Sequence, residues 1–484
     1  MRRFLLKKPF PESQARTGHE LTRTIGLASL LLMGIGSTLG TGIFFVLTEA
    51  APMAGPAIIL SFLIAAMAAG LTALCYAEVA SAIPVSGSCY TYAYMTMGQG
   101  FAILVGACLV LEWGVAAAAV AVGWSHYLNE ALRLVTGWQI PAVWSISAFQ
   151  APTPADPLPH YGNYPAMVMV ILCATLLLRG SRQSATINAV LTLLKIGLLT
   201  LFAIAVIPAF HGENFEPFIP YGIGGISQAA AIVFFSFVGL DSIVTASEEA
   251  IRPHRNIPLA ILGALVIVTI IYVLITICSL GAQPITAFAT QSAGLSQILL
   301  SVTHSPMSSI ILSTGAVLSI FSVTLVALYG LSRIYFAMAR DGLLPRKLAQ
   351  LDTKQGIPRQ AVFAATLLVV PVAGFVPTKL LWGMVSIGTL GAFIAVAISL
   401  ILLRKQHPTM PGRFRVPLYP LTPVISIACC LYLILSLDLS VQLAFLGWLC
   451  FALIIWSVCG RPNLQTPEEI GTTDTEPNQG KIAT

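Results

Sequence analysis

The chain has 484 residues, of which 57% are apolar and only 9% are charged, and its formal net charge is +6. Because so few polar residues remain to face water, this composition excludes an ordinary soluble protein, and the mean hydropathy of +0.86 is typical of a chain embedded in lipid. Nearly every long apolar run reaches the roughly 20 residues that a helix needs to cross the hydrocarbon core, and no stretch shows the alternation of a membrane barrel. We therefore expect an all-α membrane protein surrounded by the lipid bilayer.

Twelve transmembrane helices are expected along the chain. Their ranges, in order, are 25–50, 55–82, 100–129, 163–180, 185–209, 226–250, 257–281, 308–338, 360–378, 381–403, 419–437 and 441–459. The polar residues outside them predict a cytoplasmic N-terminal segment at 1–24 and a disordered cytoplasmic tail at 460–484.

Lys and Arg residues gather in the loops that lie on one side of the membrane in this arrangement. These groups are Arg2, Arg3, Lys7, Lys8, Arg16 and Arg23, then Arg179 and Arg182, Arg252 and Arg255, Arg340 to Arg359, and Arg404 to Arg415. The opposite side carries only Arg133 and Lys379. This asymmetry predicts a multi-pass protein of the cell inner (plasma) membrane with both termini in the cytoplasm, and it explains the basic residues without a nucleic-acid partner.

Two of the expected spans contain residues that disfavour a continuous helix. The first has four glycines in the nine residues from Gly34 to Gly42, and each costs about 1 kcal/mol relative to Ala in a helix interior. In the sixth span, Gly239 can leave the helix and Asp241 can cap a new one. Each break falls in the first helix of a five-helix half. We therefore predict inverted repeats at 25–209 (helices 1–5) and 226–403 (helices 6–10), followed by helices 11–12 at 419–459.

Broken helices offer backbone groups that suit a small zwitterion. The N-terminus of a half-helix presents free N–H groups and a positive dipole end to a carboxylate, and unwound carbonyl groups can accept from an ammonium group. An amino acid satisfies both. The competing interpretation is that the repeated small residues Gly36 and Gly40 only allow close helix packing, which would leave the break at Gly239 unexplained.

Several stretches carry a resemblance to a known family that extends from about Leu21 to Trp456. They are Gly34 to Phe44, Tyr76 to Glu78, Ile83 to Ser88, Phe234 to Asp241 with Glu248 and Glu249, and Ser332 to Pro345. At these residues the chain resembles the APC (amino acid-polyamine-organocation) superfamily, and specifically its bacterial cationic amino acid transporters.

The resemblance implies a fold of five plus five inverted helices with two extra helices, working by alternating access. It implies that Thr41 and Gly42 meet the substrate carboxylate. It also implies that the amino group meets the carbonyl groups of four residues: Thr38, Phe235, Ser236 and Val238. Ser236 and Phe237 stand where related sequences often have Ala and Tyr, so the preferred substrate side chain does not carry over.

A few side chains near the breaks invite separate predictions. Glu112, in the middle of the third span, either lines the pocket and accepts a basic side chain or bonds inward to hold helices together. Phe235 and Phe237 flank the second break and are candidates for a lid over the substrate. Asp241 is interpreted as a helix cap in preference to a proton carrier, and Glu78 as a structural partner of nearby backbone groups or hydroxyls.

Lys195 lies about ten residues inside the fifth span, roughly 15 Å from its nearer end, which is too deep for its side chain to reach the headgroups. We expect it to bond to carbonyl groups of the broken first span and to hydroxyls such as that of Ser322. The family resemblance places this lysine where sodium-coupled relatives of the fold hold an ion. Because burial disfavours the charged form, Lys195 is predicted to release and regain a proton during transport. The alternative is a permanently charged strut between the fifth and first spans.

The sequence also lacks the motifs of other functional classes. It contains no P-loop or nucleotide fingerprint, its seven histidines have no metal-ligand spacing, and no nucleophile and base pair is visible in the spans. We therefore expect no cofactor, no metal and no enzymatic activity. The prediction is a secondary active amino acid transporter, by proton-coupled symport, with an exchanger without net proton coupling or a transporter-like amino acid sensor as alternatives.

Overall fold

The structure is a computed structural model that describes residues 2–8, 25–40, 42–83, 88–151, 158–179, 185–245, 250–289, 291–352, 357–407 and 414–459. Throughout these residues the protein is helical and has no β-strand; one isolated bridge joins Ile25 to Ala250. The α-helices of the first half are α1 (Leu27–Thr38), α2 (Gly42–Ala54), α3 (Ile58–Ala82), α4 (Ser88–Thr96), α5 (Gln99–Val110), α6 (Ala116–Thr136), α7 (Ala142–Ser145), α8 (Tyr164–Leu178) and α9 (Ala185–Val206).

The α-helices of the second half are α10 (Gly222–Val233), α11 (Ser242–Thr245), α12 (Pro253–Ala282), α13 (Ile285–Phe288), α14 (Gly294–Thr303), α15 (Pro306–Arg340), α16 (Arg359–Phe375), α17 (Thr378–Gln406), α18 (Leu421–Ser436) and α19 (Leu439–Cys459). Short turns complete the chain: 3-10 turns at η1 (Arg2–Leu5), η2 (Gly55–Ala57), η4 (Ile207–Ala209), η5 (Gly212–Phe215), η6 (Phe234–Phe237) and η8 (Arg346–Ala349), and a π-helical turn at η3 (Leu111–Val115).

A helix, or a pair of helices separated by a break, lies over each of the twelve ranges expected from the sequence. Within the described residues, eight helical segments are long and apolar enough to cross a membrane, and five shorter apolar helices accompany them. The protein is therefore a helical, multi-pass membrane protein, while the number of crossings and the repeat symmetry remain predictions. The sequence interpretation missed the helices α4, α7, α13 and α14 and the π-helical turn.

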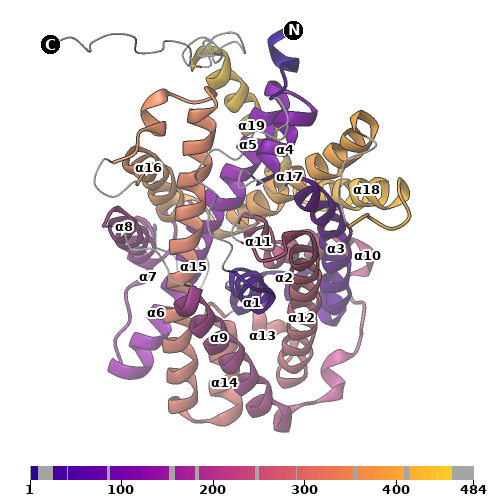
Figure 1. The fold of residues 1–484 in the computed structure, drawn as a ribbon. Coiled ribbons are helices and arrows are strands. Elements are labelled where there is room, and N and C mark those ends of the chain that lie inside the picture. The colour runs from indigo at the N-terminus through magenta and orange to yellow at the C-terminus, as the bar shows by residue number, and fades with distance from the viewer. Residues whose placement is uncertain are drawn as a thin grey trace, which may run out of the picture.

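The helices differ in how much of their surface faces other helices. The continuous segment Gln99–Thr136 runs through α5, η3 and α6, and 94% of its most apolar 18-residue stretch is buried. The corresponding fraction for Leu439–Val458 in α19 is 11%. Small residues such as those at Ala116–Ala119 allow this close packing around α6. In Figure 1, α1 lies near the middle of the molecule, in contact with α9 and α12, and α18 lies at its periphery. The two breaks are therefore central.

The described ends of the chain lie at the same end of the molecule (Figure 1). The ring of Phe4 in η1 lies 6.0 Å from that of Trp456 near the end of α19, in an edge-to-face contact. We call the end of the molecule at which η1 and the end of α19 meet the terminal face. An even number of crossings would produce this arrangement.

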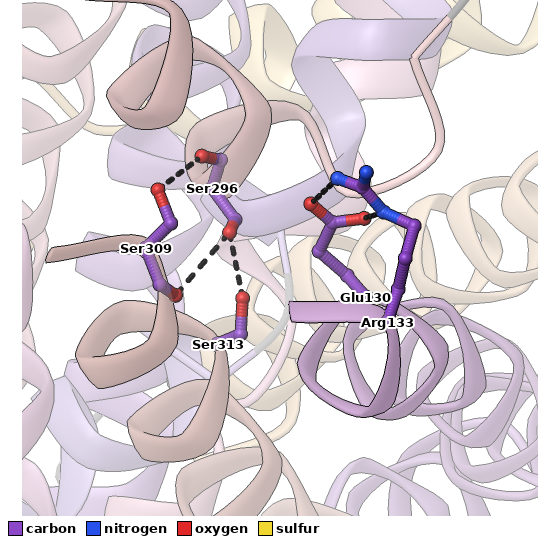
Figure 2. Close-up of polar contacts among 5 residues, drawn as sticks. All are labelled: Glu130, Arg133, Ser296, Ser309 and Ser313. Atoms are coloured by element: carbon purple, nitrogen blue, oxygen red, sulfur yellow. Dashed lines mark hydrogen bonds and ion pairs between the residues drawn. The ribbon is translucent and has the colours of Figure 1, made fainter. Parts of the chain in front are cut away.

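The basic residues predicted for the opposite side are both neutralised. Arg133 donates to both carboxylate oxygens of Glu130 within α6, at 2.7 and 3.1 Å, as Figure 2 shows. Lys379 pairs with Asp438 at 2.7 Å.

Figure 2 also shows how the start of α15 is fixed to α14: the Ser296 hydroxyl lies 2.6 Å from that of Ser313.

Glu78 in α3 is a structural residue, as expected, but its partner was not predicted. Its two oxygens accept from Nε and Nη2 of Arg404 in α17, both at 2.6 Å, and one also accepts from the backbone N–H of Val416. The guanidinium also lies over the ring of Tyr419, 4.1 Å from its centroid. This bidentate pair fixes α3 to α17 and to the segment that leads to α18.

Candidate functional site

The first predicted span is interrupted within its glycine-rich stretch. Helix α1 ends at Thr38, and α2 begins at Gly42 after a turn that contains Leu39 and Gly40. Thr41, predicted to meet a carboxylate, lies outside the described residues. Gly42 is thus the first residue of a new helix, where free N–H groups are available.

The sixth predicted span is interrupted as well. Helix α10 tightens into the 3-10 turn η6, Val238 is extended with φ −66° and ψ 139°, and Gly239 has a φ of +106° that favours glycine. The next helix, α11, starts at Ser242. The chain therefore has two breaks at the positions that the glycines predicted.

The two breaks lie against each other. The Ser37 hydroxyl is 2.7 Å from the carbonyl oxygen of Gly239 and 2.8 Å from the hydroxyl of Ser242. A Cβ atom added at Gly42 would lie 2.5 Å from the Cα of Ser236 and closer still to its side chain, so only glycine fits there. Segments about 200 residues apart in the sequence thus form one continuous backbone site.

Tyr272 in α12 joins the breaks and was missed by the sequence interpretation. Its buried hydroxyl lies 2.6 Å from the carbonyl oxygen of Thr38 and 2.8 Å from that of Ser236. These are two of the four carbonyl groups predicted to meet an ammonium. Because a phenol has one proton, it can donate to only one of the two oxygens at a time, and the other retains capacity for a further donor.

The two lid candidates point toward different helices. Phe235 packs on Trp382 of α17, with ring centroids 4.6 Å apart, and Trp382 also stacks on Phe45 of α2 at 6.2 Å. Phe237 instead packs edge-on against Tyr272 at 5.5 Å. Trp382 thereby bridges the second half of the broken first span and the first half of the broken sixth span, a role that no sequence pattern indicated.

The carbonyl groups of Phe235 and Val238 complete the predicted set. That of Phe235 accepts from the N–H of Val238 at 3.1 Å. The side chain of Ser236 is buried, and its hydroxyl has no hydrogen-bond partner among the described residues. This hydroxyl is a polar group near the breaks that a bound molecule could satisfy.

Two buried carboxylates lie close to the site. Glu112 sits in the π-helical turn η3 and is 2% exposed, and Asp241 beside the second break is 5% exposed. Within the described residues, Oε1 of Glu112 has no hydrogen-bond partner. Such turns are often found at functional sites, and an unsatisfied buried carboxylate needs a proton or a cation as partner.

The interpretation of Asp241 as a helix cap is not supported by its geometry. It directly precedes α11, and the N–H groups of Asp241 and Ser242 lie near its carboxylate. Neither oxygen, however, makes a well-formed hydrogen bond within the described part of the chain. The N–H of Ser242 donates to the carbonyl of Gly239 instead, at 3.1 Å, because the turn at the break directs it there.

Lys195 in α9 is buried, with 1% of its surface exposed, and its Nζ donates to the carbonyl oxygen of Gly36 at 2.7 Å. The expected contact with the broken first span is therefore present. Ser322, the other expected partner, donates to the carbonyl of Ser319 at 2.8 Å. One turn before Lys195, the side chain of Thr192 occupies the place that a Cβ atom at Gly36 would take. Because Gly36 has no side chain, α9 can approach α1 closely.

A membrane-embedded helical bundle in which two helices are interrupted at a shared, buried site defines the class of a membrane transporter. A family model described as amino acid permease matches residues 25–459. The chain belongs to this family, within the APC superfamily, and is a transport protein and not an enzyme.

Curated relatives match the chain over most of its length. The methylthioribose transporter of Bacillus subtilis (strain 168) is 37% identical over 459 residues, which cover 94% of this chain and 97% of the relative. The branched-chain amino acid permease BcaP of the same organism is 37% identical over 457 residues, with the same coverage. The vacuolar cationic amino acid transporter 2 of Arabidopsis thaliana is 34% identical over 405 residues, 81% of this chain and 61% of the relative.

Proposed function

We propose that this protein carries α-amino acids across the cell inner membrane by alternating access, as a proton-coupled symporter. The observation that carries the proposal is the pair of interrupted helices, which meet at Gly42 and Ser236 and at Ser37 and Gly239. Under the proposal, residues 25–209 and 226–403 are inverted repeats, residues 419–459 add two helices, and the terminal face is cytoplasmic.

The substrate carboxylate is placed at the N-terminus of α2, beginning at Gly42, because free N–H groups and the positive end of the helix dipole stabilise an anion there. The ammonium group is placed at the carbonyl groups of Thr38 and Ser236, where the oxygen of Tyr272 now lies. That position is within hydrogen-bond distance of both carbonyls. Substrate binding at this position would therefore require the Tyr272 hydroxyl to move away from it.

Glu112 is proposed to select the substrate side chain. A basic side chain would give its unsatisfied oxygen a charged donor. A neutral substrate would leave Glu112 protonated, since a buried carboxylate without a charged partner resists ionisation.

Lys195 is proposed to carry the coupling proton. The ammonium bond from Lys195 to Gly36 attaches it to the broken helix that is proposed to bind the substrate, so a change in that helix changes the environment of the charge. Loss of this bond would leave an unpaired ammonium in an apolar bundle and favour release of its proton.

The test is uptake by purified protein in liposomes, with and without a pH gradient, using neutral, basic and α-decarboxylated amino acids together with methylthioribose. Accumulation of amino acids driven by an inward proton gradient, and its loss without the α-carboxylate, supports the proposal. A requirement for sodium would overturn the proton assignment. Transport of methylthioribose in preference to amino acids would overturn the carboxylate and ammonium site.

A variant of Lys195 separates coupling from a structural strut. Lys195→Met should abolish accumulation against a gradient while exchange of internal for external substrate continues. Undiminished proton-driven uptake would remove Lys195 from the mechanism. Exchange without any net uptake in the unmodified protein would favour the exchanger, and binding without either would favour the sensor.

A further inference from the structure

The indole N–H of Trp382, in α17, is buried and unused. The side chain is 2% exposed, and its Nε1 has no hydrogen-bond partner among the described residues. Trp448 shows the usual arrangement, since its N–H donates to the carbonyl oxygen of Ala107 at 3.0 Å. Trp456 also has an unpaired N–H, but it lies near the end of α19, close to the end of the described chain. A buried donor without an acceptor is costly, so the one at Trp382 requires an explanation.

Trp382 lies on the face of α17 that packs against the sixth span before its break. Along this face, the Ser386 hydroxyl lies 3.5 Å from the carbonyl oxygen of Ile232 in α10. The ring of Phe393 lies edge-on to that of Phe234 in η6, with centroids 5.7 Å apart. Positions 382, 386 and 393 share one side of a helix because successive members are four and seven residues apart. The side chain of Trp382 is therefore directed toward η6.

The start of α17 is held in place on its other sides. Lys379, one turn before Trp382, pairs with Asp438 at 2.7 Å. A Cβ atom added at Gly383 would lie 2.6 Å from Cγ2 of Val441, so α17 and α19 are in close contact there. These contacts fix the position of the indole ring, and a fixed donor can discriminate between ligands.

Rings from both broken spans contact the indole. Phe45 of α2 is stacked on Trp382 with an interplanar angle of 20°, and the ring centroid of Phe235 in η6 lies 4.6 Å from that of Trp382. Because the N–H lies in the plane of the indole, it is directed away from the stacked ring of Phe45. The Ser236 hydroxyl, also in η6, is a second buried group that lacks a partner within the described part of the chain. Both groups are thus available to a bound molecule.

The substrate is proposed to lie between the same two segments. Its carboxylate is placed at Gly42, the first residue of α2, and its ammonium group at the carbonyl groups of Thr38 and Ser236. The Cα atom of the substrate, from which its side chain leaves, then lies between α2 and η6. Trp382 contacts both of these segments, so its N–H is a donor for an acceptor atom on that side chain.

We propose that Trp382 selects the substrate side chain by donating its indole N–H to an oxygen acceptor on it. The substrate class is then amino acids with a hydroxyl or carboxamide side chain, in preference to apolar amino acids of the same shape, because an apolar side chain leaves the buried donor unpaired. This selectivity rests on the proposed amino acid site. It differs from the role proposed for Glu112, since a carboxylate responds to a basic side chain, whereas an indole N–H needs an acceptor.

The test compares two pairs of amino acids that have nearly the same shape: asparagine with leucine, and threonine with valine. Each competes against uptake of a labelled, transported amino acid by the full chain in liposomes, and the concentration that halves uptake is measured. Members of a pair share the carboxylate and ammonium groups, so the ratio of their concentrations reports the side chain alone. Trp382→Phe keeps an aromatic ring but removes the donor. It should shift the ratio toward the apolar member about tenfold in at least one pair, which corresponds to ~1.4 kcal/mol.

Trp448→Phe is the matched control, because it removes an indole N–H that already has an acceptor in the protein. It should leave both ratios unchanged. Unchanged ratios in Trp382→Phe, or an equal loss for all four competitors, overturn the proposal, because Trp382 would then serve packing alone. A shift produced by Ser236→Ala and not by Trp382→Phe also overturns it, since the serine hydroxyl would be the group that contacts the side chain.

The unmodified protein gives a measurement that does not depend on the folding of a variant. It should favour asparagine over leucine or threonine over valine, because an apolar pocket without a donor favours the apolar member. Preference for the apolar member in both pairs overturns the selectivity alone. Absence of uptake of any amino acid overturns the proposed function, and the selectivity with it.

Discussion

The contact between Gly42 and Ser236 allows a direct test of how the two breaks work together. Gly42→Ala adds one Cβ, which would lie 2.5 Å from the Cα of Ser236 and nearer to its side chain, below the 3.0 Å that real Cβ atoms respect. The two segments must separate by about 1 Å to reach an ordinary carbon contact of about 3.5 Å. Overpacking of this kind costs about 1–3 kcal/mol, or roughly 5- to 150-fold in a conformational equilibrium.

The expected result is a loss of liposome uptake of about tenfold or more for Gly42→Ala. Ser236→Gly removes the colliding Cβ and Oγ but leaves the Cα, and it breaks no hydrogen bond of that hydroxyl among the described residues. The double variant should therefore recover part of the lost uptake, with a coupling of about 1 kcal/mol. Gly197→Ala is the control, since a Cβ there meets nothing within 4 Å.

Two results would refute this reasoning. If Gly42→Ala transports normally, the breaks do not need their close approach. If its uptake is lost and Ser236→Gly restores none of it, the added methyl acts on the bound carboxylate and not on Ser236. Melting temperatures in detergent distinguish both outcomes from simple unfolding.

Three further substitutions test single contacts. Glu112→Gln should weaken uptake of basic amino acids more than of neutral ones, and an equal loss would indicate a structural role. Tyr272→Phe keeps the ring but removes the one proton that serves the carbonyl groups of Thr38 and Ser236, so the melting temperature should fall by an amount equivalent to about 1–3 kcal/mol; an unchanged melt would contradict the bridge. Arg404→Met leaves Glu78 buried without a positively charged partner at a cost of about 3 kcal/mol, and melting like the unmodified protein would show that the pair adds nothing.

The sequence by itself determined the class of fold and the location of the breaks. An apolar composition with few charges requires backbone groups to bond within helices, since lipid offers no partners. Glycines from Gly34 to Gly42 and at Gly239 then weaken two of those helices, and the structure is interrupted at both places. Lys195 was found because an ammonium so deep in a span has to meet a backbone or side-chain acceptor.

Only the tertiary structure decided which residues face the breaks and which pairs hold the bundle. Tyr272, Trp382 and Arg404, the partner of Glu78, come from helices far away in the sequence. In a soluble helix, an apolar stripe marks the buried face. In a helix surrounded by lipid, the faces toward lipid and toward protein are both apolar, so the periodicity that would reveal an inward-facing tyrosine or tryptophan is absent and packing alone determines its partner.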